Sequence, residues 1–232
     1  MNRDKSNFDP VWENSIYGQG RHLNRYPFDC VVSFVFRHRP RNKPAEQTRV
    51  LELGCGAGNN LWFAAREGFQ VFGLDASVSA IAYAKKRFAK EGLSGEFQAG
   101  DFTRLPYQDN FFDLVIDRAA ITCVGRTAAG KIIAGVHRVL ATGGKFHFNP
   151  YSAKHASHAS GIAGEDGLTV NIAGGSLTGV GQICFYDRNA MLAPFAKGWR
   201  VCSLQHVEHT ELVDRNSSVH AEYRLIAEKS EK

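Results

Sequence analysis

The middle of the chain alternates between short apolar runs and longer stretches in which apolar residues recur every three or four positions. Runs of strand type lie at residues 49–53, 70–74, 96–99, 112–116 and 145–148. Helical spacing lies at residues 59–67, 77–91 and 131–140, and glycines at 68, 92 and 143–144 are expected to end these helices. Repeated strand and helix units of this length predict an α/β fold, with a parallel sheet and helices on both faces.

The N-terminal part departs from this alternation. Apolar residues recur at helical spacing over residues 11–37, and prolines at 40 and 44 interrupt the pattern before the first strand. We therefore interpret residues 1–48 as an N-terminal helical cap or arm, and residues 49–232 as the main domain.

The last third of the chain carries two further features. Residues 152–185 are rich in Gly, Ala and Ser and suit no single regular element, so we interpret them as a substrate-facing insertion. Residues 201–208 and 219–228 are β-rich and are joined by a polar turn. They are expected to finish the sheet with an antiparallel pair.

Composition is that of a globular domain. The chain has 232 residues, of which 44% are hydrophobic and 22% charged, and this size fits one α/β domain. No run of 18 apolar residues predicts a membrane span, and no apolar stretch follows the charged residues 1–5 as in a secretory signal. The five cysteines lack paired spacing, which indicates reduced, inert thiols and no metal site. We expect a cytoplasmic monomer or homodimer.

The net charge of +5 makes nucleic acid a partner to consider. Much of this charge lies in residues 85–90 of one predicted helix and in the proline-containing link at 37–43. Such clusters are more typical of a solvated helix face and a polar linker. The charge fits an anionic small substrate equally well, so it does not choose between the two, although no separate nucleic-acid-binding module is evident.

Glycines at 54, 56 and 58 follow the first strand and suggest a ligand site. Gly54 permits a sharp turn, and Gly56 lets a ligand approach the backbone. The following helix offers free N–H groups and a partial positive charge at its N-terminus. Asp75 ends the second strand, where it can accept two ribose hydroxyls, and Asp101 and Phe102 after the third strand can bind an adenine amine and ring.

A nicotinamide dinucleotide is the rival ligand for such a turn. Its fingerprint is G-x-G-x-x-G, whereas this chain reads G-x-G-x-G and has Asn at position 59. The added presence of Glu52, Asp75, Asp101 and Phe102 favours a different nucleoside-bearing cofactor.

Five segments in order resemble the successive motifs of class I S-adenosylmethionine-dependent methyltransferases. They lie at residues 51–58, 73–77, 100–102, 112–117 and 136–144, and the resemblance covers roughly residues 49–149. It implies a Rossmann-like sheet of seven strands, mostly parallel with the last strand antiparallel, and S-adenosylmethionine as the cofactor. The cofactor-binding residues that it implies are Glu52, Gly54, Cys55, Gly56, Gly58, Asp75, Ala76, Asp101, Phe102, Asp117 and Arg118. The glycines would line the methionine half, and Asp117 with Arg118 would lie beside the sulfonium.

Methyl transfer from a sulfonium needs alignment, and an alcohol acceptor also benefits from a general base. Among the nine histidines, we predict His155 and His158 as base candidates because they lie just past the fifth strand, with His147 inside that strand as a third. The remaining histidines of the strands and helices, His220 among them, are predicted to be surface or satisfied polar positions.

Acceptor contacts are predicted from two segments. In the arm, Tyr17, Arg21, Arg25 and Tyr26 could close over the cofactor and meet an anionic acceptor, although Trp12 and Tyr26 could equally pack and the arginines be solvated. Asn149 and Tyr151 after the fifth strand are also expected to face the substrate. The sequence Asn149-Pro150-Tyr151 is similar to the N/D-P-P-Y signature of amino-group methyltransferases, but it follows strand five instead of four and lacks one proline.

These patterns predict an O-methyltransferase of a small molecule, with a hydroxyl, phosphate or carboxylate of a metabolite or surface-glycan precursor as the acceptor. Two alternatives stay open. One is an RNA or protein methyltransferase, and the other is a non-catalytic protein that binds the cofactor with the same fold.

Overall fold

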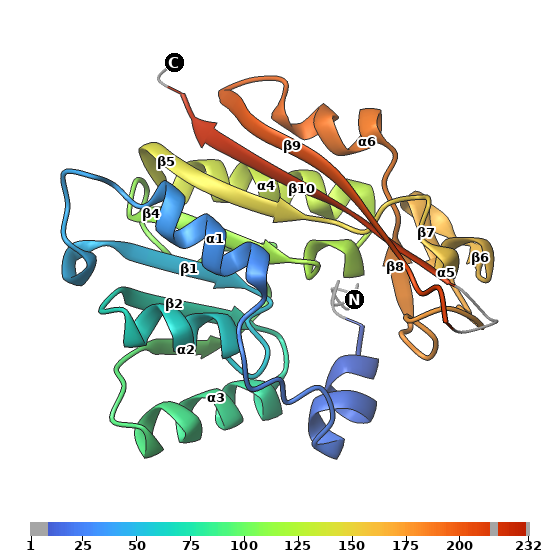
Figure 1. Ribbon diagram of the computed structural model, residues 1–232, viewed down its shortest axis with the longest axis horizontal. Coiled ribbons are helices and arrows are strands. Elements are labelled where there is room, and N and C mark those ends of the chain that lie inside the picture. The colour runs from blue at the N-terminus through green and yellow to red at the C-terminus, as the bar shows by residue number, and fades with distance from the viewer. Residues whose placement is uncertain (1–8, 214–217, 231–232) are drawn as a thin grey trace, which may run out of the picture.

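The centre of the molecule is a seven-stranded sheet in the order β3-β2-β1-β4-β5-β10-β9 (Figure 1). The computed structural model describes residues 9–213 and 218–230. The predicted absence of a secretory signal was based on residues 1–5, which lie outside the described ranges. The strands are β1 (Arg49–Leu53), β2 (Gln70–Asp75), β3 (Glu96–Ala99), β4 (Phe112–Arg118), β5 (Leu140–Asn149), β9 (Trp199–Thr210) and β10 (Val219–Lys229). Strands β1 to β5 pair in parallel, and β10 pairs antiparallel to both β5 and β9. The predicted fold class is confirmed.

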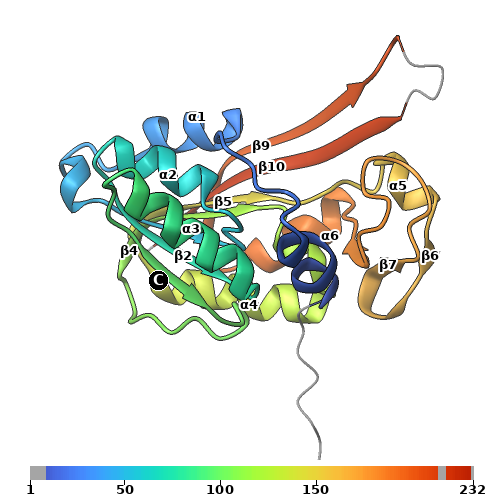
Figure 2. The same ribbon diagram turned by 90° about the horizontal axis from the view of Figure 1, so that it is seen from below.

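Helices cover both faces of this sheet, as Figure 2 shows. The α-helices are α1 (Asp29–His38), α2 (Asn59–Arg66), α3 (Val78–Lys90), α4 (Arg126–Val139), α5 (Ala156–Ala159) and α6 (Arg188–Leu192). Helices α1 to α3 pack with one hydrophobic cluster, and α4 and α6 pack with another. Successive residues of β1 alternate between them: Val50 belongs to the first cluster and Leu51 to the second. This alternation is expected of a strand buried on both faces.

Short helical turns complete the elements. They are η1 (Trp12–Ile16), η2 (Tyr17–Gln19), η3 (Ala45–Gln47), η4 (Ile121–Cys123), η5 (Glu165–Gly167) and η6 (Ala193–Phe195). Residues 11–37 were expected to be helical throughout, but residues 21–28 lie between η2 and α1 without a helix. The arm is therefore two helical pieces joined by a non-helical link.

One predicted helix end is wrong. Helix α4 begins at Arg126 and ends at Val139, and β5 starts at once, so Gly143 and Gly144 lie inside a strand. The register shifts there, because Phe112 pairs with Leu140 whereas Leu114 pairs with Lys145. Gly143 has a φ of +76°. The two glycines thus serve an irregularity of the sheet and not a helix terminus.

The insertion forms structure of its own. Strands β6 (Ile162–Ala163), β7 (Leu168–Val170) and β8 (Gln182–Cys184) make a small antiparallel sheet in sequence order. Two bridges tie this region to the rest of the fold: Tyr151 pairs with Glu222 of β10, and Ser152 pairs with Tyr186. The sequence did not predict these strands.

None of the helices in residues 9–213 and 218–230 has the length and apolar character needed to cross a bilayer.

Candidate cofactor and acceptor site

A cavity of about 410 Å³ lies at the carboxyl ends of the parallel strands. From the arm it is lined by Trp12, Tyr17, His22, Asn24 and Phe28. From the strand ends and α2 it is lined by Glu52, Gly54, Cys55, Gly56, Asn59, Asn60, Asp75, Ala76, Phe102, Arg118, Ala119, Ala120, Cys123 and Tyr151. From the insertion and β10 it is lined by Ser176, Leu177, Thr178, Val180, Ile183 and His220. Three parts of the chain that are distant in sequence therefore share one cavity.

The glycine turn at the base of this cavity needs glycine at two positions for steric reasons. Gly54 has a φ of +63°, and a Cβ there would overlap the Cβ of Ala120. Gly56 has a φ of +49°, and a Cβ there would overlap the hydroxyl of Tyr17. Gly58 has a different role, because a Cβ there would meet Ala84 of α3 at 3.1 Å. It allows close packing of the turn on α3 and does not line the cavity.

Asp75 fastens the glycine turn to the end of β2. Its Oδ2 accepts a hydrogen bond from the backbone N–H of Gly56, and its Oδ1 accepts one from that of Ser77, each at 2.8 Å. Burial raises the pKa of this carboxyl, and the two N–H donors oppose the rise. Each carboxylate oxygen has a second lone pair, so the group that shapes the turn can still accept ligand hydroxyls.

Glu52 is a buried carboxyl group in which one of the two oxygens accepts no hydrogen bond from the described residues. Its Oε1 accepts a hydrogen bond from Asn60 Nδ2 at 2.6 Å, whereas its Oε2 has no hydrogen-bond partner within the described residues. Burial raises the pKa of Glu52 to about 8. A buried carboxyl of this kind is stabilised by a cationic ligand group, because the charge would offset the desolvation.

Polar contacts hold the arm over the turn. Glu13 accepts hydrogen bonds from the hydroxyls of Ser77 and Ser79, at 2.5 and 2.6 Å, at the N-terminus of α3. At the start of α2, Asn59 Nδ2 donates to the carbonyl of Tyr26 at 2.9 Å. The arm is thus held beside the cavity by contacts with the N-termini of α2 and α3.

The other predicted cofactor residues divide into two groups. Cys55, Ala76, Phe102 and Arg118 line the cavity, as listed above. Asp101 is exposed and outside the lining, and its Oδ1 accepts the backbone N–H of Thr103 at 2.8 Å. Asp117 is fully buried and also outside the lining: its Oδ1 accepts the N–H groups of Ala120 and Ile121. Burial raises the pKa of Asp117 to about 7 against these N–H donors. It holds the turn after β4, next to Ala119 with its φ of +60°.

The predicted acceptor residues also divide. Tyr17 and Tyr151 line the cavity, whereas Arg21, Arg25 and Tyr26 of the arm are exposed and outside the lining. Asn149 is buried and outside the lining too. Its Nδ2 donates to the carbonyl of Tyr223 at 2.6 Å, so it joins β5 to β10.

The three predicted base candidates do not line the cavity. His147 is buried and stacks on Phe34 of α1 with ring centroids 5.2 Å apart. His158 is exposed, with its Nδ1 3.0 Å from the carbonyl oxygen of Ala153. His155 is buried behind the cavity, where its Nε2 lies 3.1 Å from Nδ1 of His220.

His220 itself lines the cavity, although the sequence reasoning set it aside. The missed signal is the alternation along β10, in which His220, Glu222 and Arg224 share one face of the strand. The opposite face carries Ala221 and Leu225, which are fully buried.

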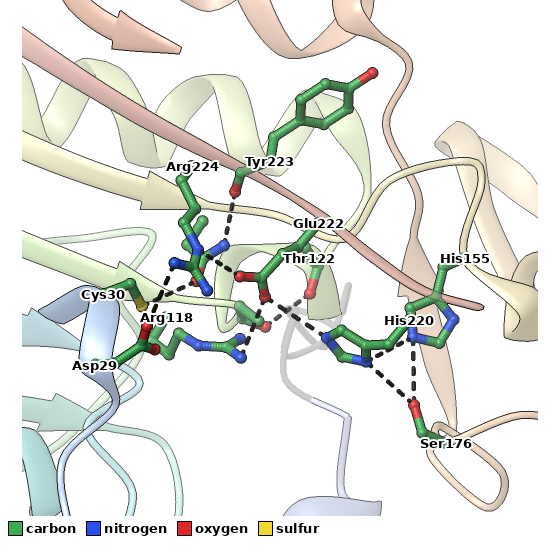
Figure 3. A network of polar contacts seen from close by, with 12 residues as sticks. Asp29, Cys30, Arg118, Thr122, His155, Ser176, His220, Glu222, Tyr223 and Arg224 are labelled. Carbon is green, nitrogen blue, oxygen red and sulfur yellow. Dashed lines mark hydrogen bonds and ion pairs between the residues drawn. The ribbon is translucent and has the colours of Figure 1, made fainter. Parts of the chain in front are cut away.

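Glu222 is the centre of a charged network beside the cavity (Figure 3). Its Oε2 lies 3.3 Å from Arg118 Nη2 and 3.6 Å from His220 Nε2, and its Oε1 accepts from Arg224 Nε at 2.8 Å. Burial alone would raise the pKa of Glu222, but its contacts with His220 and the two guanidinium groups outweigh burial and lower it to about 2. The carboxylate therefore stays charged, and it fixes Arg118 at the end of β4.

Comparisons with known proteins agree with this geometry. A family model described as a methyltransferase domain matches residues 50–144. An uncharacterized methyltransferase of Synechocystis sp. is 37% identical over 98 residues, which cover 42% of this chain and 44% of the relative. A phthiotriol/phenolphthiotriol dimycocerosates methyltransferase of Mycobacterium tuberculosis is 34% identical over 102 residues, covering 43% of this chain and 36% of the relative. The chain spans less than half the length of either relative.

The fold is shared more widely than the sequence. The crystal structure of a SAM-dependent methyltransferase from Methanosarcina mazei matches with a TM-score of 0.69 at 21% identity, covering 86% of this chain and 98% of that chain. The cavity also fits S-adenosylmethionine, because Glu52 offers a buried oxygen to its ammonium and Asp75 offers lone pairs to its ribose hydroxyls. Residues 50–144 therefore match a methyltransferase domain, and the chain as a whole shares the fold of this SAM-dependent methyltransferase.

Proposed function

We propose that the protein transfers a methyl group from S-adenosylmethionine to an oxygen atom of a small-molecule acceptor. The observation that carries the proposal is the continuity of the cavity. The same cavity is lined by Gly54 and Asp75 of the cofactor motifs and by Ser176 and His220 from the last third of the chain. A site with a cofactor end and a separate acceptor end is what group transfer between two bound molecules requires.

The cofactor supplies, when bound, a methyl group already activated on a sulfonium. The residues of the chain supply binding and alignment. Glu52 and Asp75 would hold the amino-acid and ribose ends, and the glycine turn would let both approach the backbone. Trp12 and Tyr17 of the arm line the same cavity and would cover the bound cofactor, and Arg118 is paired with Glu222 beside the acceptor end.

The size of the cavity supports a small acceptor. A volume of about 410 Å³ is within the range of small-ligand sites. The mycobacterial relative is likewise a methyltransferase of phthiotriol and phenolphthiotriol dimycocerosates and not of nucleic acid or protein. We also propose that residues 1–48 act as a cap on the cofactor end and that residues 152–185 face the acceptor.

Calorimetry with S-adenosylmethionine tests the cofactor half of the proposal. Asp75→Asn is expected to lower the affinity at least tenfold, because it removes a charged acceptor of hydroxyl hydrogen bonds. Asp109→Asn is the matched control, since Asp109 is exposed and pairs with Arg138 away from the cavity. Equal affinities for the two variants would refute the assignment of the site.

A transfer screen tests the acceptor half. Cofactor labelled in its methyl group is incubated with the protein and with small phenols, nucleotide sugars or phosphorylated metabolites, and bulk tRNA serves as a nucleic-acid arm. We expect label in a small molecule. Label in tRNA alone would contradict the proposal and favour an RNA methyltransferase.

A further inference from the structure

We propose that His220 is the general base of this site, and that the acceptor is a neutral hydroxyl group on an apolar, ring-sized body. This inference rests on the methyl transfer proposed above and names its reacting group. It is carried by the hydrogen-bond geometry around His220 and by the chemical character of the cavity wall, which are independent observations.

A chain of hydrogen bonds that runs from Ser157 through His155 fixes the tautomer of His220. The backbone N–H of Ser157 donates to Nδ1 of His155 at 3.1 Å, so neutral His155 carries its proton on Nε2. That N–H points at Nδ1 of His220, 3.1 Å away, which must therefore be an acceptor. Nε2 of His220 then carries the proton and faces the carboxylate of Glu222 at 3.6 Å. Nδ1 therefore carries the lone pair that a general base needs, and without an acceptor this lone pair accepts the N–H of His155.

The hydroxyl group of Ser176 lies beside the two facing ring nitrogens. Ser176 lines the cavity, and its Oγ lies 3.4 Å from Nδ1 of His220 and 3.3 Å from Nε2 of His155 (Figure 3). An acceptor hydroxyl can donate to Nδ1 once the N–H of His155 has turned from Nδ1 to Ser176 Oγ. When Nδ1 then takes up a proton, the N–H of His155 stays turned to Ser176 Oγ, so no two N–H groups are left facing each other.

Glu222 is the positioning residue of the pair. Its carboxylate faces the N–H of His220, which orients the ring and stabilises the imidazolium that forms on proton uptake. The carboxylate is in turn held by Arg118 and Arg224. This arrangement of a fixed carboxylate, an imidazole and a hydroxyl is the general pattern of an activated oxygen nucleophile.

The character of the wall points to a neutral acceptor. Among the described residues that line the cavity, Arg118 is the one guanidinium or ammonium group, and it is already paired with Glu222. The acceptor end is walled by apolar side chains, with Leu177, Val180 and Ile183 in one cluster with Trp12 packed against it. A phosphate or carboxylate would lack a free cation here, whereas a flat apolar body with one hydroxyl would be complementary.

The proton and electron balance of the step is complete without another reactant. The acceptor oxygen forms a bond to the methyl carbon while the carbon–sulfur bond breaks, and that electron pair stays on sulfur. The hydroxyl proton moves to Nδ1 of His220. The side chain of His220 is 32% exposed, so the proton can then leave to solvent.

Binding of 4-nitrophenol to protein saturated with S-adenosylhomocysteine tests the inference without turnover. The absorbance of the nitrophenolate reports whether the bound hydroxyl has lost its proton. We expect the midpoint of ionisation to fall by about one pH unit on binding, because the imidazolium stabilises the phenolate. The titratable groups that lie around the ring are Glu222 on its own strand, His209 on β9, and His155 and Tyr151 from the segment after β5.

Two variants and a matched control separate the base from a structural role. His220→Gln is expected to abolish the fall in the midpoint, and Glu222→Gln to reduce it, with folding of each checked by thermal melting. His209→Gln is the control, because His209 lies opposite His220 in the strand register, is exposed and does not line the cavity. An unchanged midpoint in His220→Gln would overturn the base, and failure of the wild-type protein to bind the phenol would overturn the acceptor class.

Transfer of labelled methyl to graded phenols completes the test. For a weakly acidic phenol, we expect His220→Gln to lower kcat/KM by about 10²–10⁴-fold, and by much less for 4-nitrophenol, which is partly ionised without a base. Equal losses on both phenols would overturn the inference. The affinity for S-adenosylmethionine is measured in the same experiments. A wild-type protein that does not bind the cofactor would refute the proposed function itself and not only the role of His220.

Discussion

At the scale of single residues, the glycine turn sets the stability of the site. Gly54→Ala is expected to lower the free energy of unfolding by about 2 kcal/mol or more, because φ is +63° and the new Cβ would overlap that of Ala120. Gly130→Ala is the control: Gly130 lies inside α4, and nothing lies within 4 Å of a Cβ there. This change should stabilise the protein by about 1 kcal/mol through helix propensity. Urea denaturation measures both, and a destabilisation of similar size in the two variants would contradict the steric argument.

The buried carboxyl group of Glu52 is expected to lower the stability of the cofactor-free protein and to strengthen cofactor binding. Its pKa is about 8 in the folded chain against 4.5 for an ordinary glutamate, so the unfolded state loses its proton first as pH rises from 4.5. Stability is therefore lost progressively up to about pH 8. Glu52→Gln should raise the free energy of unfolding by about 1–3 kcal/mol at pH 8.5 without cofactor, and lower cofactor affinity about tenfold. Glu67→Gln, at an exposed position after α2, should change neither quantity. A variant that loses stability would show that the charged form is already compensated.

At the scale of elements, the arm is fastened to α3 by one carboxylate. Glu13 accepts from both serine hydroxyls at the helix N-terminus, and these contacts lower its pKa. Glu13→Ala should loosen the arm, weaken cofactor binding about three- to tenfold and speed tryptic cleavage at the exposed Arg21 and Arg25, since the capping energy is about 1 kcal/mol. Asn14→Ala, an exposed neighbour on the same turn, is the control. Unchanged cleavage and affinity would rule out a closing role for η1.

The elements differ in how far the sequence predicts them. Strands β1 to β4 follow from apolar runs that end at glycine or aspartate, and α3 follows from Ser77, which caps it by accepting the N–H of Ala80. The strands of the insertion have only two or three residues each, too few for a period to appear. The β10 strand was predicted, but which face of it would meet the cavity depends on its pairing with β5, and hence His220 was missed.

At the scale of the whole molecule, the site is a product of tertiary contacts. The cofactor end is local, because Gly54 and Asp75 come from adjacent strands of one β-α-β unit, and their roles can be inferred from spacing. The acceptor end joins Trp12, Ser176 and His220, which are separated by most of the chain. The pairing of β10 between β5 and β9 places His220 there, and the contacts of Glu13 with Ser77 and Ser79 hold the arm that carries Trp12. Spacing along the sequence contains no measure of such contacts, so the acceptor end required the structure.

The free energy of unfolding at acid pH is expected to depend on a buried histidine outside the site. His147 has a pKa of about 3 through burial, against 6.5 for an ordinary histidine, and neither ring nitrogen has a hydrogen-bond partner within the described residues. As pH falls below 6.5, the unfolded state binds a proton that the folded state refuses, so stability is lost until about pH 3. His155, with a pKa of about 4, acts in the same direction.

His147→Phe should reduce the loss of stability at acid pH, since it removes the titrating ring and two unsatisfied nitrogens while keeping the stack on Phe34. We expect a gain of about 1–3 kcal/mol at pH 5, where the unfolded imidazole is charged, and a smaller gain at pH 8. His209→Phe, at an exposed position of β9, should leave the loss of stability at acid pH unchanged. Urea denaturation across this pH range gives the comparison. Methyl transfer should persist in His147→Phe, because the ring lies under α1 and not in the cavity; a loss of transfer in a stably folded variant would return His147 to the candidate bases and count against His220.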